Sequence, residues 1–314
     1  MTLLWDQHAC LPLQPDADVG YLTRFARGGP TYVSVNVGYS PQTYADSTLL
    51  LNRFRAGIET HPQLRLAYGA RDITDGDPAQ IAIAFDLEDS HPLDGDLDNV
   101  ARFVDLGVRT MLPTYNHANR AGCGCLDAHD TGLSAWGRDL VARMNAAGMV
   151  PDGSHCSART GLDMCEISTK PVIYSHSCMR AVWEHPRNIT DDQARACAAT
   201  GGVVGITGVG IFLGPNTPTL EAMTRHLEYA VELVGIAHVG VSTDHSFDAA
   251  DFRAEIRDHP EAFDDSYTRW GAIEWMAPEV FITLGDHLSR RGWAESDIAA
   301  VLGANFARVA RQSW

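Results

Sequence analysis

The 314-residue chain has little lysine: Lys170 is the only one, and all other basic residues are arginines. Lysine and arginine together number 24 against 40 acidic residues, which gives a formal net charge of -16. Nucleic acids and anionic membrane surfaces bind basic patches, so this balance argues against both as partners. The acidity by itself indicates solubility and no particular ligand.

The sequence also lacks any apolar run near the roughly 18 residues that suggest a membrane span. No basic segment followed by an apolar core opens the chain, and residues 3–8 (LLWDQH) indicate a first strand instead of a secretion signal. Seven cysteines, an odd number, are typical of a reducing cytoplasm and not of a disulfide framework. We therefore expect a cytoplasmic protein with no membrane partner.

Strand-like runs alternate with helical patterns along most of the chain. The runs cover residues 3–9, 31–38, 80–88, 109–116, 149–155, 171–177, 203–210 and 238–244. Eight such units predict an α/β protein with a closed (β/α)8 barrel of the TIM type, formed by residues 1–314 as one domain. Residues 245–314 predict a C-terminal extension with helices near 278–291 and 295–311, and residues 64–80 predict a helix followed by a loop.

Five of the apolar runs end in a side chain that can bind a metal or transfer a proton: His8, Glu88, His155, His176 and Asp244. A single case, such as His176 in PVIYSHSCMR, is best explained as a core histidine satisfied by a neighbouring serine. Independent core histidines would not all choose the same end of a strand. Because catalytic groups of barrels lie at the C-terminal ends of the strands, the shared position predicts one site.

Three histidines and two carboxylates suit a transition metal, zinc above all, although other divalent metals remain open. Two ions roughly 3.5 to 4 Å apart can share a water molecule and lower its pKa. Some metal-dependent hydrolase barrels bridge two ions with a carboxylated lysine. Here Lys170 begins a strand and so lies at the wrong end of the barrel. Glu88 is the remaining candidate for a bridge, and we expect one or two zinc ions per chain.

Several motifs, in order along the chain, resemble the renal or membrane dipeptidases, which are metal hydrolases on a (β/α)8 barrel. Residues 6–10 (DQHAC) resemble the opening Asp-Gly-His-x-Asp motif, and residues 86–97 (DLEDSHPLDGDL) resemble the segment of the bridging glutamate. The most specific stretch is residues 170–193, which join Ser-His-Ser to His-Pro-Arg-Asn. Residues 290–314 resemble the last helices of the family.

The resemblance implies a metal role for four residues. His8 would bind the first metal, Glu88 would bridge both, and His155 and His176 would hold the second.

It also implies how substrate is bound and cleaved. Arg187 would pair with the α-carboxylate of a dipeptide, for which its planar fork suits two parallel hydrogen bonds, whereas an isolated arginine would suggest a surface ion pair. Asp244 would contact the attacking water and pass its proton to the leaving amine. Tyr115 and Asn116 stand at the end of the fourth strand, where many members have a histidine that contacts substrate.

Cys10 departs from the family, which has an aspartate at this position. A thiolate binds zinc well, but a neutral thiol would leave the first site with His8 and Glu88 alone. Asp89 replaces a usual glycine, and its negative charge would oppose ionisation of a nearby thiol. The sequence therefore favours one firmly held metal over two.

The sequence is compatible with three functions. The leading one is a dipeptidase-like hydrolase that cleaves a dipeptide or similar small amide with a metal-activated water, with a homodimer as a further expectation. The second is a diverged enzyme on the same scaffold with a non-dipeptide substrate. The third is a protein that binds metal or ligand without turnover.

Overall fold

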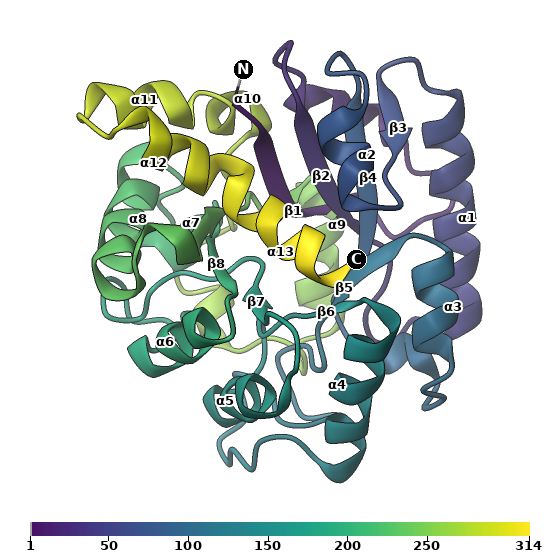
Figure 1. The fold of residues 1–314 in the computed structure, drawn as a ribbon. Coiled ribbons are helices and arrows are strands. Elements are labelled where there is room, and N and C mark those ends of the chain that lie inside the picture. Colours follow the sequence, from purple (N-terminus) through teal and green to yellow (C-terminus); the bar gives the residue numbers. More distant parts are fainter. Residues whose placement is uncertain (1) are drawn as a thin grey trace.

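Parallel strands form a ring that helices surround in the computed structural model, which describes residues 2–314 (Figure 1). The strands are β1 (Leu4–Cys10), β2 (Thr31–Asn36), β3 (Leu64–Leu66), β4 (Ile81–Leu87), β5 (Val108–Met111), β6 (Val150–Pro151), β7 (Ile173–Tyr174), β8 (Val203–Ile206), β9 (Val239–Val241) and β10 (His245–Ser246). The ladders run in the orders β10-β1-β2-β4-β5-β6 and β7-β8-β9.

Two local links join these ladders into a barrel. A parallel bridge between Asp152 and Ile173 connects the exit of β6 to β7. At the other seam, the backbone N–H of Asp244 donates to the carbonyl of His8 at 2.9 Å, just after β9. The predicted (β/α)8 barrel is thereby confirmed, with β3 and β10 as additions to its eight strands.

The helix predicted from residue 64 is wrong at its start. Residues 64–66 form β3, which pairs with the first half of β4 in the register Leu64↔Ile81, and a short helix follows only at Ala70. Three residues are too few to distinguish a period of two from a helical period. The strands β6 and β7 are also shorter than predicted, so His155 and His176 lie in the loops that follow them.

Thirteen α-helices are described besides the short 3₁₀ and π segments. They are α1 (Tyr44–Thr60), α2 (Ala70–Asp75), α3 (Asn99–Asp105), α4 (Ala135–Ala147), α5 (Ala158–Ile167), α6 (Asp191–Ala199), α7 (Gly210–Leu213), α8 (Leu220–Val234), α9 (Ala249–Asp258), α10 (Pro278–Phe281), α11 (Leu284–Arg290), α12 (Glu295–Ala299) and α13 (Asn305–Ser313). Thr190 caps the N-terminus of α6 with a full capping box. Helix α9 was not predicted from the sequence. None of its side chains is fully buried, although Phe252 and Ile256 pack against the core.

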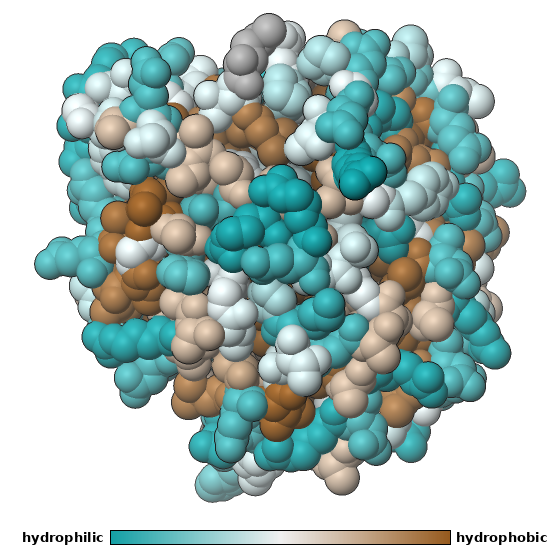
Figure 2. Space-filling view, in the orientation of Figure 1, coloured by the Kyte–Doolittle hydropathy of each residue, from teal (hydrophilic) through white to brown (hydrophobic). Residues whose placement is uncertain are grey.

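Helix α13 closes the N-terminal end of the barrel, and Figure 1 shows it lying across the ring. Phe306 packs on Trp5 inside the barrel with ring centroids 6.2 Å apart. A Cβ on Gly240 would lie 2.5 Å from the Phe306 ring, so the close approach of α13 depends on this glycine. Hydrophilic side chains lie over α13 on the face drawn in Figure 2. In the part of the chain that the structure describes, α13 therefore covers this end of the barrel interior.

None of the helices described between residues 2 and 314 is long and apolar enough to cross a membrane.

Candidate metal centre

The interior of the barrel changes from apolar to polar along each strand. On β4, Ala82 and Ala84 face the core beneath α13, and the same alternation brings Asp86 and Glu88 to the inner side further along. The outward positions of β4, from Ile81 to Leu87, belong to the shell between strands and helices. The catalytic end of the barrel therefore has a polar floor supported by an apolar base.

A bulge in β1 gives His8 and Cys10 the same inward direction. Trp5 lies in the cluster inside the barrel, whereas Ala9, four residues later, lies in the outer cluster. Strict alternation would place both on one side, but the register of β1 against β2 shifts between Asp6 and Ala9. Bulges of this kind re-aim side chains next to functional sites. No sequence pattern marked this one.

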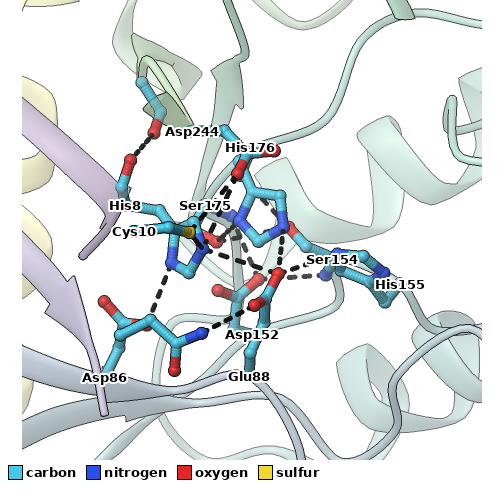
Figure 3. A network of polar contacts seen from close by, with 12 residues as sticks. His8, Cys10, Asp86, Glu88, Asp152, Ser154, His155, Ser175, His176 and Asp244 are labelled. Atoms are coloured by element: carbon cyan, nitrogen blue, oxygen red, sulfur yellow. Dashed lines mark hydrogen bonds and ion pairs between the residues drawn. The ribbon is translucent and has the colours of Figure 1, made fainter. Parts of the chain in front are cut away.

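Two groups of possible metal ligands meet at Glu88 (Figure 3). One contains His8, Cys10 and Glu88, the other contains Glu88, His155 and His176, and within each group the ligand atoms lie within 4.8 Å of one another. Glu88 Oε1 lies 3.0 Å from His155 Nε2 and 3.5 Å from the Nε2 atoms of both His8 and His176. The structure thus brings together all the ligands that the sequence proposed.

The second group fits a metal by an observation of its own. His176 is fully buried, and its Nε2 has no hydrogen-bond partner among the described residues. Buried polar atoms are nearly always paired, so an unpaired one in a cluster of ligands fits a role in metal binding. With an open position left over, one carboxylate and two imidazoles match a catalytic zinc site.

A partner on Nδ1 orients every one of the three imidazoles. The pairs are His8 with Asp86 at 2.9 Å, His155 with Asn116 at 2.7 Å, and His176 with Ser175 at 2.7 Å. Because Nδ1 is engaged in each ring, Nε2 is the nitrogen presented to the site. Of these partners, the sequence suggested only a neighbouring serine for His176; Asp86 and Asn116 were not identified as partners of ligands.

Two further buried carboxylates fix the loops that carry the ligands. Asp6 accepts hydrogen bonds from Thr243 N at 2.7 Å and Ser242 Oγ at 3.0 Å, while burial raises its pKa to about 6. Asp152 Oδ1 accepts from the backbone N–H groups of Ser154 and Ser175, both at 3.0 Å. The available signal was an aspartate two or three residues before His8, Glu88 and His155, in DQH, DLE and DGSH.

Charges in the site suit ligands that must be unprotonated. Burial opposes ionisation of Glu88, but His8 and His155 outweigh it and hold the pKa of this carboxyl well below its usual range. Burial and Arg187 lower the pKa of His155 to about 3. Burial, with His8 next, lowers the pKa of His176 well below its usual value. At neutral pH both imidazoles of the second group are therefore neutral, as metal binding requires.

Three residues of the site hold the left-handed backbone conformation. Their φ values are 55° at Asn116, 61° at His155 and 52° at Asp244, each at the exit of a strand. Asn, Asp and His tolerate this region better than other residues with a Cβ, yet it remains costly. This conformation turns the three side chains towards the site, and the surrounding structure compensates for its energetic cost.

Asp244 stands between the first ligand group and a cavity of about 860 Å³. Its Oδ1 lies 3.8 Å from His8 Nε2 and 3.9 Å from Cys10 Sγ. Burial, reinforced by Glu88 against the opposing charges of His8 and Arg187, raises the pKa of Asp244 to about 7. A carboxyl group with this pKa can both accept and return a proton near neutrality.

The two residues at the end of the fourth predicted strand take different positions. Tyr115 lines the cavity and stacks on His155 with ring centroids 4.3 Å apart. Asn116 is fully buried behind His155 and contributes nothing to the described lining of the cavity. The structure thus places Asn116 as the partner of a metal ligand, in contrast to the substrate contact expected for it.

Arg187 is a buried cation without a carboxylate partner in the described chain. Only 2% of it is exposed, which excludes the surface ion pair. Nη2 donates to the carbonyl of His176 at 3.4 Å, Nε has no partner, and the guanidinium lies over the Phe212 ring at 5.1 Å. It faces a smaller cavity of about 180 Å³, which shares His155 with the larger one.

Lys170 precedes β7 and so lies at the end of the barrel opposite to the metal ligands. Its Nζ donates to the carbonyl of Gln312 in α13, which covers this end of the barrel. It therefore cannot supply a carboxylated bridge.

A (β/α)8 barrel whose strand exits hold clustered imidazoles and carboxylates has the architecture of a metal-dependent hydrolase. The chain belongs to the membrane dipeptidase family (peptidase family M19), whose model matches residues 28–264.

Relatives of known sequence agree with this membership. An uncharacterised protein in the pqqA 5' region of Klebsiella pneumoniae is 34% identical over 62% of this chain and 76% of its own length. Dipeptidase 3 of Rattus norvegicus is 27% identical over 83% of this chain. The match spans only 51% of the length of that rat protein.

Solved structures share the whole fold. An amidohydrolase from Pseudomonas aeruginosa superimposes with a TM-score of 0.89 at 25% identity and covers 100% of this chain and 97% of its own. A metallo peptidase from Rhodobacter sphaeroides superimposes with a TM-score of 0.76 at 17% identity, with 100% of both chains covered.

Proposed function

We propose that the protein is a zinc-dependent dipeptidase that cleaves the amide bond of a dipeptide or a similarly small amide. The observation that carries this proposal is the unpaired, fully buried Nε2 of His176 beside Glu88 and His155. When bound there, a zinc ion would supply an activated water and polarise the scissile carbonyl. Family membership supports hydrolysis, and the donor set supports zinc.

Arg187 supplies the recognition that separates a dipeptide from a longer or neutral amide. Its guanidinium is desolvated and its Nε is unpaired. An anionic group that reaches it gains charge-assisted hydrogen bonds and satisfies buried donors at the same time. The free carboxylate of a dipeptide has the planar geometry that suits this fork.

Asp244 moves the proton in the proposed reaction. It lies on the wall of the cavity, beside the ligand groups, with its pKa raised by burial to about 7. In its ionised form it accepts a proton from the attacking water, and in its protonated form it donates that proton to the leaving amine. Tyr115, stacked on His155, limits the space in which the substrate lies.

The decisive experiment compares the wild type with His176→Ala in metal content and dipeptide turnover. We expect His176→Ala to lose tightly held metal and turnover together. His238→Ala is the matched control, because His238 lies just before β9 at the opposite end of the barrel. If His176→Ala keeps both properties of the wild type, the site assignment is wrong.

Hydrolysis of a small amide that is not a dipeptide is the second candidate. Asp89, which is buried and lines the cavity, favours it, because this position carries glycine in the family that the sequence resembles. Assaying the metal-loaded protein with N-acyl amino acids alongside dipeptides distinguishes the two.

A further inference from the structure

We infer that Cys10 is a metal ligand, so that His8, Cys10 and Glu88 form a thiolate-containing metal site that prefers thiophilic divalent ions. This inference rests on the proposed function, whose metal is held by Glu88, His155 and His176. It concerns the first ligand group, which contains Cys10. It also reverses the expectation from sequence that Cys10 is a bystander.

The spacing of the donor atoms carries the first part of the argument. Cys10 Sγ lies 3.3 Å from His8 Nε2, and Glu88 Oε1 lies 3.5 Å from the same nitrogen. Zinc binds imidazole nitrogen at about 2.0 Å and thiolate sulfur at about 2.3 Å, so two such ligands in a tetrahedral set lie about 3.5 Å apart. His8 Nε2 therefore already has the separation from Cys10 and from Glu88 that ligand atoms of one ion have, and all three ligand atoms lie within 4.8 Å of one another.

The direction of hydrogen bonding carries the second part. His8 Nδ1 is engaged by Asp86 at 2.9 Å, so Nε2 is the ring nitrogen that faces Cys10 and Glu88. Around this nitrogen lie Cys10 Sγ, Glu88 Oε1 and Asp244 Oδ1. Once the thiol is ionised, thiolate sulfur, carboxylate oxygen and imidazole nitrogen form a donor set that a divalent ion binds.

The backbone holds the sulfur in this position. Cys10 is the last residue of β1, where it pairs with Ser246 of β10, and its carbonyl accepts from Phe247 N at 3.0 Å. The bulge before Ala9 turns His8 and Cys10 to the same inner side. Cys10 also lines the large cavity, through which an ion can reach it.

Charge balance permits the exchange of aspartate for cysteine. As the bond from sulfur to metal forms, the thiol proton leaves to solvent. A thiolate carries the same single negative charge as the aspartate carboxylate that it replaces, so the charge of the ligand group is unchanged. What changes is softness: thiolate favours zinc, cadmium and cobalt, whereas carboxylate suits manganese and magnesium.

Cobalt titration of the full-length metal-free protein tests this inference without an activity assay. We expect wild type to bind two equivalents of Co²⁺ and to show a near-ultraviolet thiolate-to-cobalt band. Cys10→Ser should lose the band and one tight equivalent, while Cys10→Asp should keep two equivalents without the band. The preference for Cd²⁺ over Mn²⁺ should fall at least about tenfold in Cys10→Asp.

Two results would overturn the inference: a wild type without the thiolate band, or a band that persists in Cys10→Ser and so comes from another cysteine. The outcome is separable from that of the proposed function. A wild type with the band but no turnover of dipeptides refutes the dipeptidase and leaves Cys10 as a ligand. Turnover of dipeptides without the thiolate band refutes Cys10 as a ligand and leaves the proposed function intact.

Discussion

The side-chain amide of Asn36 donates to Glu88 Oε2 at 2.8 Å, and the other oxygen of this carboxylate faces the three imidazoles. Asn36 is itself anchored, because its Oδ1 accepts from Gly38 N at 2.8 Å. The orientation of the carboxylate common to both ligand groups therefore depends on a residue of a neighbouring strand.

We expect Asn36→Ala to weaken metal binding by roughly 10- to 100-fold, the usual effect of removing a partner that orients a ligand. Competition with a chromophoric chelator measures this affinity. Ser34→Ala is a useful comparison, because Ser34 Oγ donates to Asp86 and so acts on His8 only indirectly. Equal affinities of wild type and Asn36→Ala would show that Glu88 is held without its amide partner.

Arg187 should make the enzyme sensitive to the charge at the substrate's C-terminus. Amidation of a dipeptide should reduce kcat/KM by the equivalent of about 2–5 kcal/mol, since a buried charge is left unpaired. In Arg187→Met the free and amidated dipeptides should be cleaved with similar kcat/KM. Comparable turnover of both forms by the wild type would remove Arg187 from the substrate site.

The charge of the large cavity should select the substrate side chain. Its described lining contains Asp248, Asp251 and Glu255 on or beside α9, and no lysine or arginine. Glu255 is partly buried, and burial raises its pKa. We expect dipeptides with a lysine side chain to be preferred over those with glutamate.

Glu255→Gln should reduce this preference by roughly two- to fivefold, the size of one partly screened ion pair. Asp192→Asn on α6, an exposed acid outside the cavity lining, removes the same charge elsewhere and serves as the control. A preference for glutamate dipeptides in the wild type would contradict the prediction.

His226 should contribute to acid denaturation independently of the metal centre. It is fully buried, accepts from Met179 N at Nδ1, and donates from Nε2 to the carbonyl of Leu213. Burial lowers its pKa from 6.5 to about 4. Because the folded pKa is depressed, the stabilisation is complete above pH 6.5 and is lost as the pH falls towards 4.

The difference between the unfolded and folded pKa of His226 corresponds to roughly 3 kcal/mol of unfolding free energy. His226→Asn, which keeps an acceptor near Met179 N, should therefore show a shallower loss of stability between these two pH values in urea unfolding. Parallel pH profiles for the two proteins would exclude His226 as a contributor.

The barrel and most of the ligands could be predicted because each ligand directly follows an apolar run and lies in a local motif. The partners Asn36 and Asp6 could not, since their importance depends on strands that pair far apart in the sequence. The bulge in β1 depends on register, which has no local signature in residues 4–10. Asn116 was assigned to substrate because sequence order cannot tell a cavity wall from the position directly behind it.

Helix α13 has a consequence for synthesis of the chain. Trp314 and Phe306 pack against Trp5, with ring centroids 6.1 Å and 6.2 Å apart, so β1 finds its final neighbours among residues that are translated long after it. While the ribosome still holds residues 305–314, the base of the barrel stays open and its apolar interior is exposed. A nascent chain of this protein therefore needs protection from aggregation until translation has passed α13, and a truncation before Asn305 should leave that need permanent.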